Sequence, residues 1–266
     1  MSTALVTGAS AGIGLALARR LAREGNDLVL VARTRARLER LATELRASHG
    51  SEVEVLVADL SDRSQTLVVC DRLADPDRPV DLLVNNAGFG LSRPFLDNEV
   101  AQEEAAIDVM VRAVMLTCHA AGRAMRERGR GTIINVSSVA SFTATGTYSA
   151  EKSFVTVFSE ALAEQLRGTG VTVTALCPGL TRTEFHERAR MRLSGVPDAV
   201  WLDADEVAQQ GLADAAAGKV LSVPGPLWVT VSTLIRALPR PLVRSGAGRV
   251  VMSLRRSRDP ETTIGG

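Results

Sequence analysis

The chain has 266 residues, of which 45% are hydrophobic, and its formal net charge is +1. This length and composition are enough for one sizeable buried core, and the near-neutral charge gives no electrostatic reason to expect nucleic-acid binding. Cys70, Cys118 and Cys177 are isolated in apolar stretches, which predicts free thiols in a reducing compartment. Neither the cysteines nor the histidines have metal-ligand spacing, so we expect no metal site.

A short apolar segment, residues 3–8, predicts a first strand. It runs into the glycine-rich sequence TGASAGIG, residues 7–14, and then into a predicted helix. Glycines let backbone amides approach a pyrophosphate, and the start of a helix adds partial positive charge. We therefore expect a nucleotide-binding turn here. Because the first strand starts at the third residue and no uncharged run reaches transmembrane length, we also expect no signal peptide and a cytoplasmic protein.

Further apolar segments alternate with helical patterns along the chain. Near-continuous apolar strands separated by helices indicate a parallel sheet covered on both faces. The sequence thus predicts an α/β fold, a single-domain doubly wound parallel sheet. The expected strands after the first are residues 28–32, 53–58, 81–85, 131–137 and 171–177.

The only tyrosine, Tyr148, lies four residues before Lys152, near the start of a predicted helix over residues 147–166. Side chains four residues apart on a helix share one face, roughly 6 Å apart. A free phenol titrates near ~10, and an adjacent cation favours the phenolate and lowers that pKa. The pair therefore predicts a tyrosine that works as a general acid or base. A surface tyrosine and lysine at helical spacing is the alternative.

Five motifs follow one another: TGASAGIG at 7–14, NNAG at 85–88, INVSS at 134–138, YSAEK at 148–152 and CPGLTRT at 177–183. On these motifs the chain resembles the short-chain dehydrogenase/reductase family, in the branch with ketoacyl, hydroxysteroid and carbonyl reductases. The resemblance implies a Rossmann-type domain and hydride transfer between a nicotinamide cofactor and a carbonyl or alcohol.

The same resemblance assigns catalytic roles. It implies that Tyr148 donates or accepts the proton and that Lys152 binds the nicotinamide ribose and lowers the pKa of Tyr148. It also implies that Ser138 hydrogen-bonds the substrate oxygen. Ser138 and Tyr148 would together stabilise developing alkoxide charge without a metal.

Other positions are expected to bind the cofactor. Asp59 matches a family residue near the adenine, with a helix cap as an equal alternative, and the Pro-Gly pair at 178–179 has a plain turn as its alternative. Asn85 is expected to join neighbouring strands instead. The expected cofactor-binding set is Gly8, Ser10, Gly12, Ile13, Gly14, Arg33, Asp59, Leu60, Asn86, Ala87, Gly88, Tyr148, Lys152, Pro178, Gly179 and Thr183.

The end of the second strand favours one form of the cofactor. NAD-selective members carry an acid there that binds the adenosine ribose hydroxyls, whereas this chain has Ala32, Arg33 and Thr34. Arg33 can hold a 2′-phosphate as a charged fork. We therefore expect NADP(H), with NAD(H) disfavoured. The alternative is that Arg33 and Arg37 only solvate the start of a helix.

Two features depart from the family pattern. Met110 stands in DVMV where many members have a catalytic asparagine, and a thioether cannot replace an amide, although the backbone carbonyl is retained. The loop between Ser138 and Tyr148 is shorter than is usual, so Ser137 and Ser141 are alternatives for the serine role.

The first 225 residues are expected to form the domain, including a substrate lid near 181–201 whose arginines either attract an acidic substrate or form a solvated face. Residues 226–256 contain six arginines and no acid and are expected to be a basic amphipathic extension, interrupted by Pro239 and Pro241. Packing as an interface or lid is favoured there over contact with a membrane surface. Residues 257–266 are expected to be a loose tail.

The sequence thus predicts an NADP(H)-dependent oxidoreductase that interconverts a lipophilic ketone or aldehyde and an alcohol. A nucleotide-binding sensor or scaffold with weakened catalysis is the rival function, which Met110 would permit. The resemblance also implies a homodimer or homotetramer, since family members commonly pair through the fourth and fifth helices.

Overall fold

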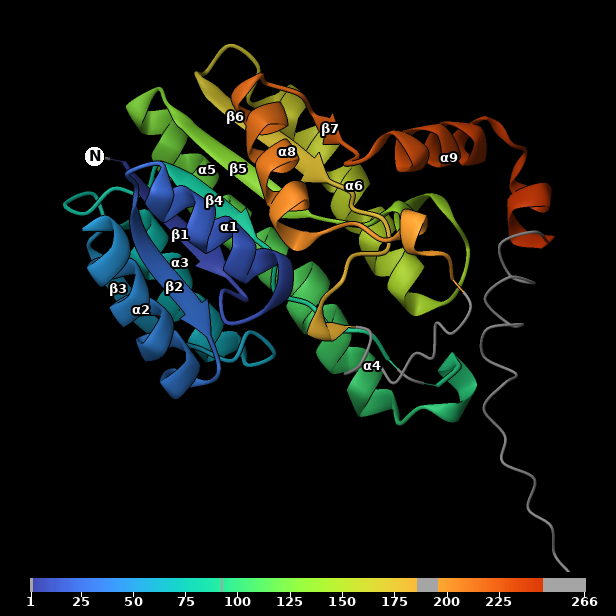
Figure 1. Ribbon diagram of the computed structural model, residues 1–266, viewed down its shortest axis with the longest axis horizontal. Coiled ribbons are helices and arrows are strands. Elements are labelled where there is room, and N and C mark those ends of the chain that lie inside the picture. The colour runs from blue at the N-terminus through green and yellow to red at the C-terminus, as the bar shows by residue number, and fades with distance from the viewer. Residues whose placement is uncertain (1, 92, 186–195, 246–266) are drawn as a thin grey trace, which may run out of the picture.

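A seven-stranded parallel sheet forms the centre of the molecule (Figure 1). The computed structural model describes residues 2–91, 93–185 and 196–245. The strand order is β3-β2-β1-β4-β5-β6-β7, so the chain reverses its direction of travel across the sheet between β1 and β4. Ligands of such sheets bind outside the carboxyl ends of the strands at this point. The strands are β1 Thr3–Thr7, β2 Asp27–Ala32, β3 Val53–Val57, β4 Leu82–Asn85, β5 Gly131–Val136, β6 Val171–Leu176 and β7 Leu221–Ser222.

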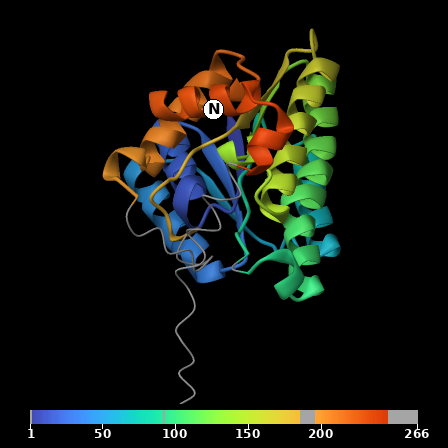
Figure 2. The same ribbon diagram turned by 90° about the vertical axis from the view of Figure 1, so that its right-hand side faces the viewer.

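Helices cover both faces of the sheet (Figure 1, Figure 2). Leu17, Leu38 and Val207 belong to the apolar core under α1, α2 and α8, whereas Val69 and Val155 belong to the core under α3, α5 and α6. The strands are buried from both sides, which explains why their sequences are apolar almost throughout. The helices are α1 Gly12–Arg23, α2 Arg35–His49, α3 Arg63–Ala74, α4 Val100–Ile107, α5 Ala113–Arg128, α6 Thr147–Gln165, α8 Ala204–Ala216 and α9 Pro226–Ala237, with short helices η1 Phe95–Asp97, η2 Asp108–Arg112, η3 Val139–Phe142 and η4 Asp198–Val200.

The predicted fold class is confirmed. All six expected strands form, and the helix expected over residues 147–166 is α6. The seventh strand, β7, was not predicted. It has two residues, too few to show any periodicity, and it exists because β6 offers a free edge to pair with.

One helical stretch is long and apolar enough to cross a membrane. It runs from Val100 to Arg128, through α4, the π-helical turn η2 and α5, and half of its most apolar window is buried. Its buried residues, including Met110 and Met125, belong to the core on the sheet, and α5 packs on α3 and β5. The stretch is therefore a core helix.

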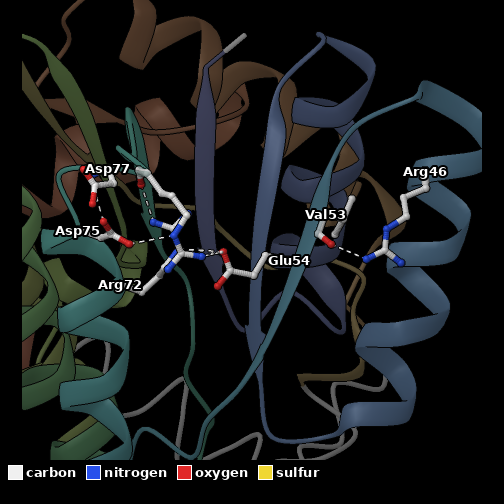
Figure 3. A network of polar contacts seen from close by, with 7 residues as sticks. Arg46, Val53, Glu54, Arg72, Asp75 and Asp77 are labelled. Atoms are coloured by element: carbon white, nitrogen blue, oxygen red, sulfur yellow. Dashed lines mark hydrogen bonds and ion pairs between the residues drawn. The ribbon is translucent and has the colours of Figure 1, made fainter.

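Ion pairs fasten α3 to the edge strand β3 at the amino ends of the strands (Figure 3). Arg72 is only 8% exposed, and its Nε donates to Glu54 Oε2 over 2.8 Å while its Nη1 donates to the Arg78 carbonyl. Arg78 in turn pairs with Asp75, and Arg46 of α2 donates to the Val53 carbonyl. These side chains cover a sheet edge that would otherwise be open.

Part of the C-terminal region lies outside the described residues. Of the expected lid, Thr181 pairs with Leu202 and Arg182 forms an ion pair with Asp198 over 2.7 Å, whereas residues 186–195 are not described. Residues 246–256 of the basic extension and the expected tail, 257–266, also lie outside the described residues.

Candidate active site

A cleft of about 750 Å³ opens at the carboxyl ends of the central strands, where the sheet reverses direction. The loops after β1, β2, β3 and β4 and the segment after β6 line it. Eleven of the expected cofactor residues face this cleft: Gly8, Ser10, Gly12, Ile13, Arg33, Asp59, Leu60, Asn86, Ala87, Gly88 and Thr183.

The glycines bring backbone close to backbone in the turn before α1. Gly8 has a φ of +66°, and a Cβ there would lie 2.7 Å from Asn86 Nδ2. A Cβ on Gly14 would lie 2.3 Å from the same nitrogen and 2.5 Å from the Gly8 carbonyl oxygen. The first turn of α1 has no acidic residue and no side-chain cap, so its amides are free to bind an anion. The cradle therefore fits a dinucleotide pyrophosphate.

Thr7 and Asn86 hold this turn against the end of β4. Thr7 Oγ1 accepts hydrogen bonds from the amides of Asn86 and Ala87 over 3.0 and 3.1 Å. Asn86 Nδ2 donates to the carbonyls of Thr7 and Gly8. Thr7 was missing from the expected residues, because its partners lie almost eighty positions further along the chain.

Asp59 lies in the cleft and is not a helix cap. Its Oδ1 accepts from the amide and hydroxyl of Ser61, whereas the N-cap of α3 is Asp62, which accepts from the amides of Ser64 and Gln65. The cap alternative for Asp59 is therefore wrong. Asn85, by contrast, donates to Asn135 across β4 and β5 over 2.9 Å, which is the strand-joining role expected of it.

Two arginines at the mouth of the cleft differ in their partners. Arg37 forms an ion pair with Glu184 over 3.1 Å, which links α2 to the segment after β6. Arg33 is exposed, lines the cleft and has no ion-pair partner among the described residues. Its guanidinium is thus available for an anionic ligand.

Ser138, Tyr148 and Lys152 meet where β5 gives way to α6. Ser138 lies beside the Tyr148 phenol and lowers its pKa, and Lys152 Nζ lies 5.7 Å from the centre of the Tyr148 ring. Lys152 is buried, and its Nζ donates to the Val136 carbonyl over 2.8 Å. The four-residue spacing thus places phenol and ammonium on one helix face beside a hydroxyl group.

The alternatives to Ser138 make other contacts. Ser137 Oγ is buried and donates to the Lys152 carbonyl. Ser141 is also buried, and its Oγ has no hydrogen-bond partner among the described residues. Ser138 is therefore the serine that contacts the phenol.

The pKa of Tyr148 moves in the direction opposite to the expected one. Burial raises it above its ordinary value, and this effect outweighs the hydrogen bond from Ser138, which lowers it. Burial also lowers the pKa of Lys152 to about 8, so the charged form of the lysine is less favoured than in water. Desolvation disfavours both charged forms, and Tyr148 is a neutral phenol with a proton to donate.

Met110 lies directly behind the cleft. A Cβ on Gly88 would lie 3.2 Å from Met110 Sδ and 3.7 Å from Lys152 Nζ. Met110 sits in η2, the π-helical turn that interrupts α4 and α5, and such turns are frequent at functional sites. The thioether thus fills the space behind Gly88 without offering a hydrogen bond to the lysine.

One aromatic ring lies in the cleft near Tyr148, and a second packs on the segment after β6. The ring of Phe185 lies 5.6 Å from that of Tyr148. The indole of Trp228, in α9, packs against Gly179, where a Cβ would lie 2.1 Å from its Cε2. Pro178 accepts a hydrogen bond from the amide of Val139, so the 178–179 segment joins β6 to η3. Neither ring was expected at the site, since each arrives from a distant segment.

The sequence matches the short chain dehydrogenase family over residues 2–193. The chain belongs to this family. Galactitol 2-dehydrogenase (L-tagatose-forming) from Cereibacter sphaeroides is 34% identical over 240 residues, which cover 87% of this chain and 91% of that protein. Solved structures that cover all of this chain include two from different organisms. A short-chain dehydrogenase from Sphingobium yanoikuyae in complex with NADPH has a TM-score of 0.82 and 31% identity, with 99% of its chain covered. The bulky-bulky ketone specific alcohol dehydrogenase from Comamonas testosteroni has a TM-score of 0.78 and 27% identity, with 97% covered.

The predicted family and enzyme class are confirmed. As a short-chain dehydrogenase, the protein is an oxidoreductase that works with NAD(P) on the CH–OH or C=O group of its substrate.

Two buried carboxyl groups lie near Tyr148 and Lys152 in this short-chain dehydrogenase. Glu103 of α4 is 4% exposed and Glu151 of α6 is 5% exposed. Asn98 donates to Glu103 Oε1 over 2.7 Å, but Glu103 Oε2 and Glu151 Oε1 have no hydrogen-bond partner among the described residues. Burial raises the pKa of Glu151 to about 7, opposed by the charge of Lys152 and assisted by that of Glu103.

Replacing Glu151 with Gln should make folding stability less dependent on pH. Because the pKa of Glu151 is raised in the folded protein, the folded state keeps a proton that the unfolded chain loses as the pH rises. Stability that is present below the ordinary pKa of 4.5 is therefore lost as the pH rises through about 7, and the loss is about 3 kcal/mol. Melting curves at about pH 5 and about pH 8 should diverge less for Glu151→Gln than for the parent.

Glu104 supplies the matched control, since it is the exposed neighbour of Glu103. Glu104→Gln should follow the parent at both pH values. Identical pH dependence in Glu151→Gln and the parent would contradict a Glu151 that titrates near neutral pH.

Proposed function

We propose that this short-chain dehydrogenase is an NADPH-dependent carbonyl reductase that can also run in the alcohol-oxidising direction. The observation that carries the proposal is the contact of Ser138 with a neutral Tyr148 phenol, with the Lys152 ammonium 5.7 Å from the phenol ring. A hydroxyl, a proton donor and a cation beside a nucleotide cleft are what carbonyl reduction requires.

The nicotinamide, when bound, supplies the hydride that the carbonyl carbon accepts. Tyr148 donates its proton to the carbonyl oxygen as negative charge develops there, and Ser138 donates a second hydrogen bond to the same oxygen. Lys152 is held by the Val136 carbonyl, and its positive charge favours the phenolate that is left behind. In the oxidising direction the same groups act in reverse.

NADPH is the proposed form of the cofactor. Arg33 stands unpaired among the described residues at the end of β2, where no acid is present, and the similar protein from Sphingobium yanoikuyae was solved with NADPH. The remaining expected contacts, from Gly8 to Thr183, are proposed as the binding site for the rest of the dinucleotide.

Replacing Arg33 with Asp should weaken NADPH binding by about 10- to 100-fold, because the charged hydrogen bonds to the 2′-phosphate are lost and repulsion replaces them. NADH binding should change little. Titration of both cofactors by fluorescence measures this. Arg35→Asp is the matched control, since Arg35 pairs with Glu39 outside the cleft. Equal losses of NADH and NADPH binding in Arg33→Asp would refute the 2′-phosphate contact.

The proposed substrate is a lipophilic ketone or aldehyde. Phe185 lines the cleft beside Tyr148, Trp228 packs on Gly179, and Phe142 lies in η3, the turn that Ser138 begins. Aromatic side chains near Tyr148 favour an apolar substrate body. A residue that selects among such substrates is expected in the proposed lid, 181–201.

The direct test is NADPH oxidation across ketones and aldehydes of increasing chain length. We expect kcat/KM to rise with chain length as more apolar surface is buried. NADPH binding without turnover of any carbonyl would instead favour a nucleotide sensor. A preference for short, polar carbonyls would contradict the proposal of a lipophilic substrate but would still support the proposed reductase activity.

We also propose a cytoplasmic homodimer or homotetramer. Ile107, Met115 and Val157 are exposed on α4, α5 and α6, and apolar side chains on an outer helix face favour association of copies. We further propose that the domain extends over residues 1–225 and that it includes the lid near 181–201.

A further inference from the structure

The C-terminal helix α9 is anchored along one of its sides. Trp228 Nε1 donates to the Val200 carbonyl over 3.0 Å, and Ser232 is buried. The guanidinium of Arg236 lies 5.5 Å from the centre of the Phe142 ring in η3. In the short helical segment that follows, residues 240–245, Val243 is also buried. The orientation of α9 on the domain is therefore fixed by these contacts.

The opposite side of α9 carries exposed leucines. Leu227 and Leu234 are spaced by seven residues, which puts them on one side of the helix, and Leu234 is 62% exposed. Leu238, directly after the end of α9, and Leu242, in the short helical segment 240–245, are exposed as well. We call these four residues the exposed leucines. A cluster of this kind at the edge of a molecule marks an interaction surface.

The sequence segment that contains the exposed leucines carries only positive charges. Residues 226–256 carry six arginines and no acid, so this segment has a charge of +6, and the rest of the chain, with 25 basic and 30 acidic residues, has −5. Arg236, Arg240 and Arg244 are exposed in the described part. The sequence segment that carries the exposed leucines is thus basic, whereas the rest of the sequence is acidic on balance.

We propose that α9 and the helical segment 240–245 after it dock on an anionic lipid bilayer. Leucines beside arginines, with no acid among them, suit a helix that lies in the plane of a membrane interface, and anionic headgroups attract each arginine near the surface. The acidic remainder of the chain would be repelled, which orients the molecule with α9 toward the lipid.

Docking would bring the catalytic end of the cleft close to the bilayer. Trp228 of α9 touches Gly179, and Arg236 touches Phe142 of η3, the turn that Ser138 begins. Figure 1 shows α9 at the edge of the molecule beyond β7. A lipophilic compound dissolved in the bilayer would therefore have a short path to Tyr148. The docking itself does not depend on the proposed function and can be tested without catalysis.

The test is sedimentation of the full-length chain with phosphatidylcholine vesicles, with and without phosphatidylglycerol, at low and high salt. We expect binding to the anionic vesicles that weakens at high salt. Arg240→Gln with Arg244→Gln should weaken it by about fivefold for each arginine, and Leu234→Ser with Leu238→Ser should abolish most of it. Melting temperatures should match the parent, because all four side chains are exposed.

Two controls carry the same substitutions elsewhere. Leu96→Ser removes a leucine that is 91% exposed in η1, and Arg167→Gln removes an exposed arginine after α6; neither should change vesicle binding. The proposal fails if anionic vesicles are not bound, if neutral vesicles are bound equally well, or if the leucine variant binds like the parent. A leucine variant that turns a dimer into a monomer and still binds vesicles would assign this surface to a second copy of the chain.

Discussion

Replacing Tyr148 with Phe should abolish most turnover while leaving the protein folded and able to bind NADPH. The substitution removes one hydroxyl, the group that interacts with Ser138 and that supplies the proton in the proposed mechanism. General acid catalysis by a positioned side chain contributes roughly 10²- to 10⁴-fold to a rate, so kcat for NADPH oxidation should fall by that factor. The ring remains, and with it the contact with Phe185.

The comparison needs a variant that removes a nearby hydroxyl outside the proton path. Ser141→Ala serves, because Ser141 Oγ is buried and makes no hydrogen bond within the described structure. It should keep kcat within about twofold and gain slightly in stability, since an unsatisfied polar group is removed. If Tyr148→Phe kept substantial turnover with unchanged NADPH affinity, Tyr148 would not be the proton donor.

The fold could be predicted because its signals are local. Apolar runs of five or six residues, separated by helical patterns, specify a parallel sheet wherever they occur. β7 escaped prediction, since its two residues form a strand only through pairing with β6. The position of Tyr148 and Lys152 on one face of α6 could also be predicted, because side chains four residues apart on a helix share a face.

The surroundings of the site could not be predicted in this way. Trp228 reaches Gly179 across about fifty residues, and Glu103 lies near Glu151 across a similar separation. No periodic pattern links such positions. The predicted direction of the Tyr148 pKa shift was wrong for the same reason: the sequence shows the cation four residues away, but the burial that raises the pKa comes from the whole fold.

Replacing Gly14 with Ala should destroy the nucleotide cleft. The new Cβ would lie 2.3 Å from Asn86 Nδ2 and 2.5 Å from the Gly8 carbonyl oxygen, distances that side chains do not tolerate. Asn86 is the residue that clamps the turn by donating to the carbonyls of Thr7 and Gly8. Relief of the clash must therefore break this clamp or move α1 away from β4. We expect NADPH binding to be lost and stability to fall by about 1–3 kcal/mol, the usual cost of overpacking.

Helix propensity alone would predict that Gly14→Ala raises stability, because Ala is more favourable than Gly in a helix by about 1 kcal/mol. Gly122→Ala measures the effect of helix propensity without a clash. Gly122 is a buried glycine of α5, and a Cβ there would lie 3.9 Å from its nearest atom. Thermal melting should show a gain for Gly122→Ala and a loss for Gly14→Ala, and NADPH titration should show unchanged binding in the first and none in the second. A Gly14→Ala protein that is stabilised and still binds NADPH would mean that the turn is not held by Asn86. The contrast thus separates a glycine that the cleft requires from one that the helix merely contains.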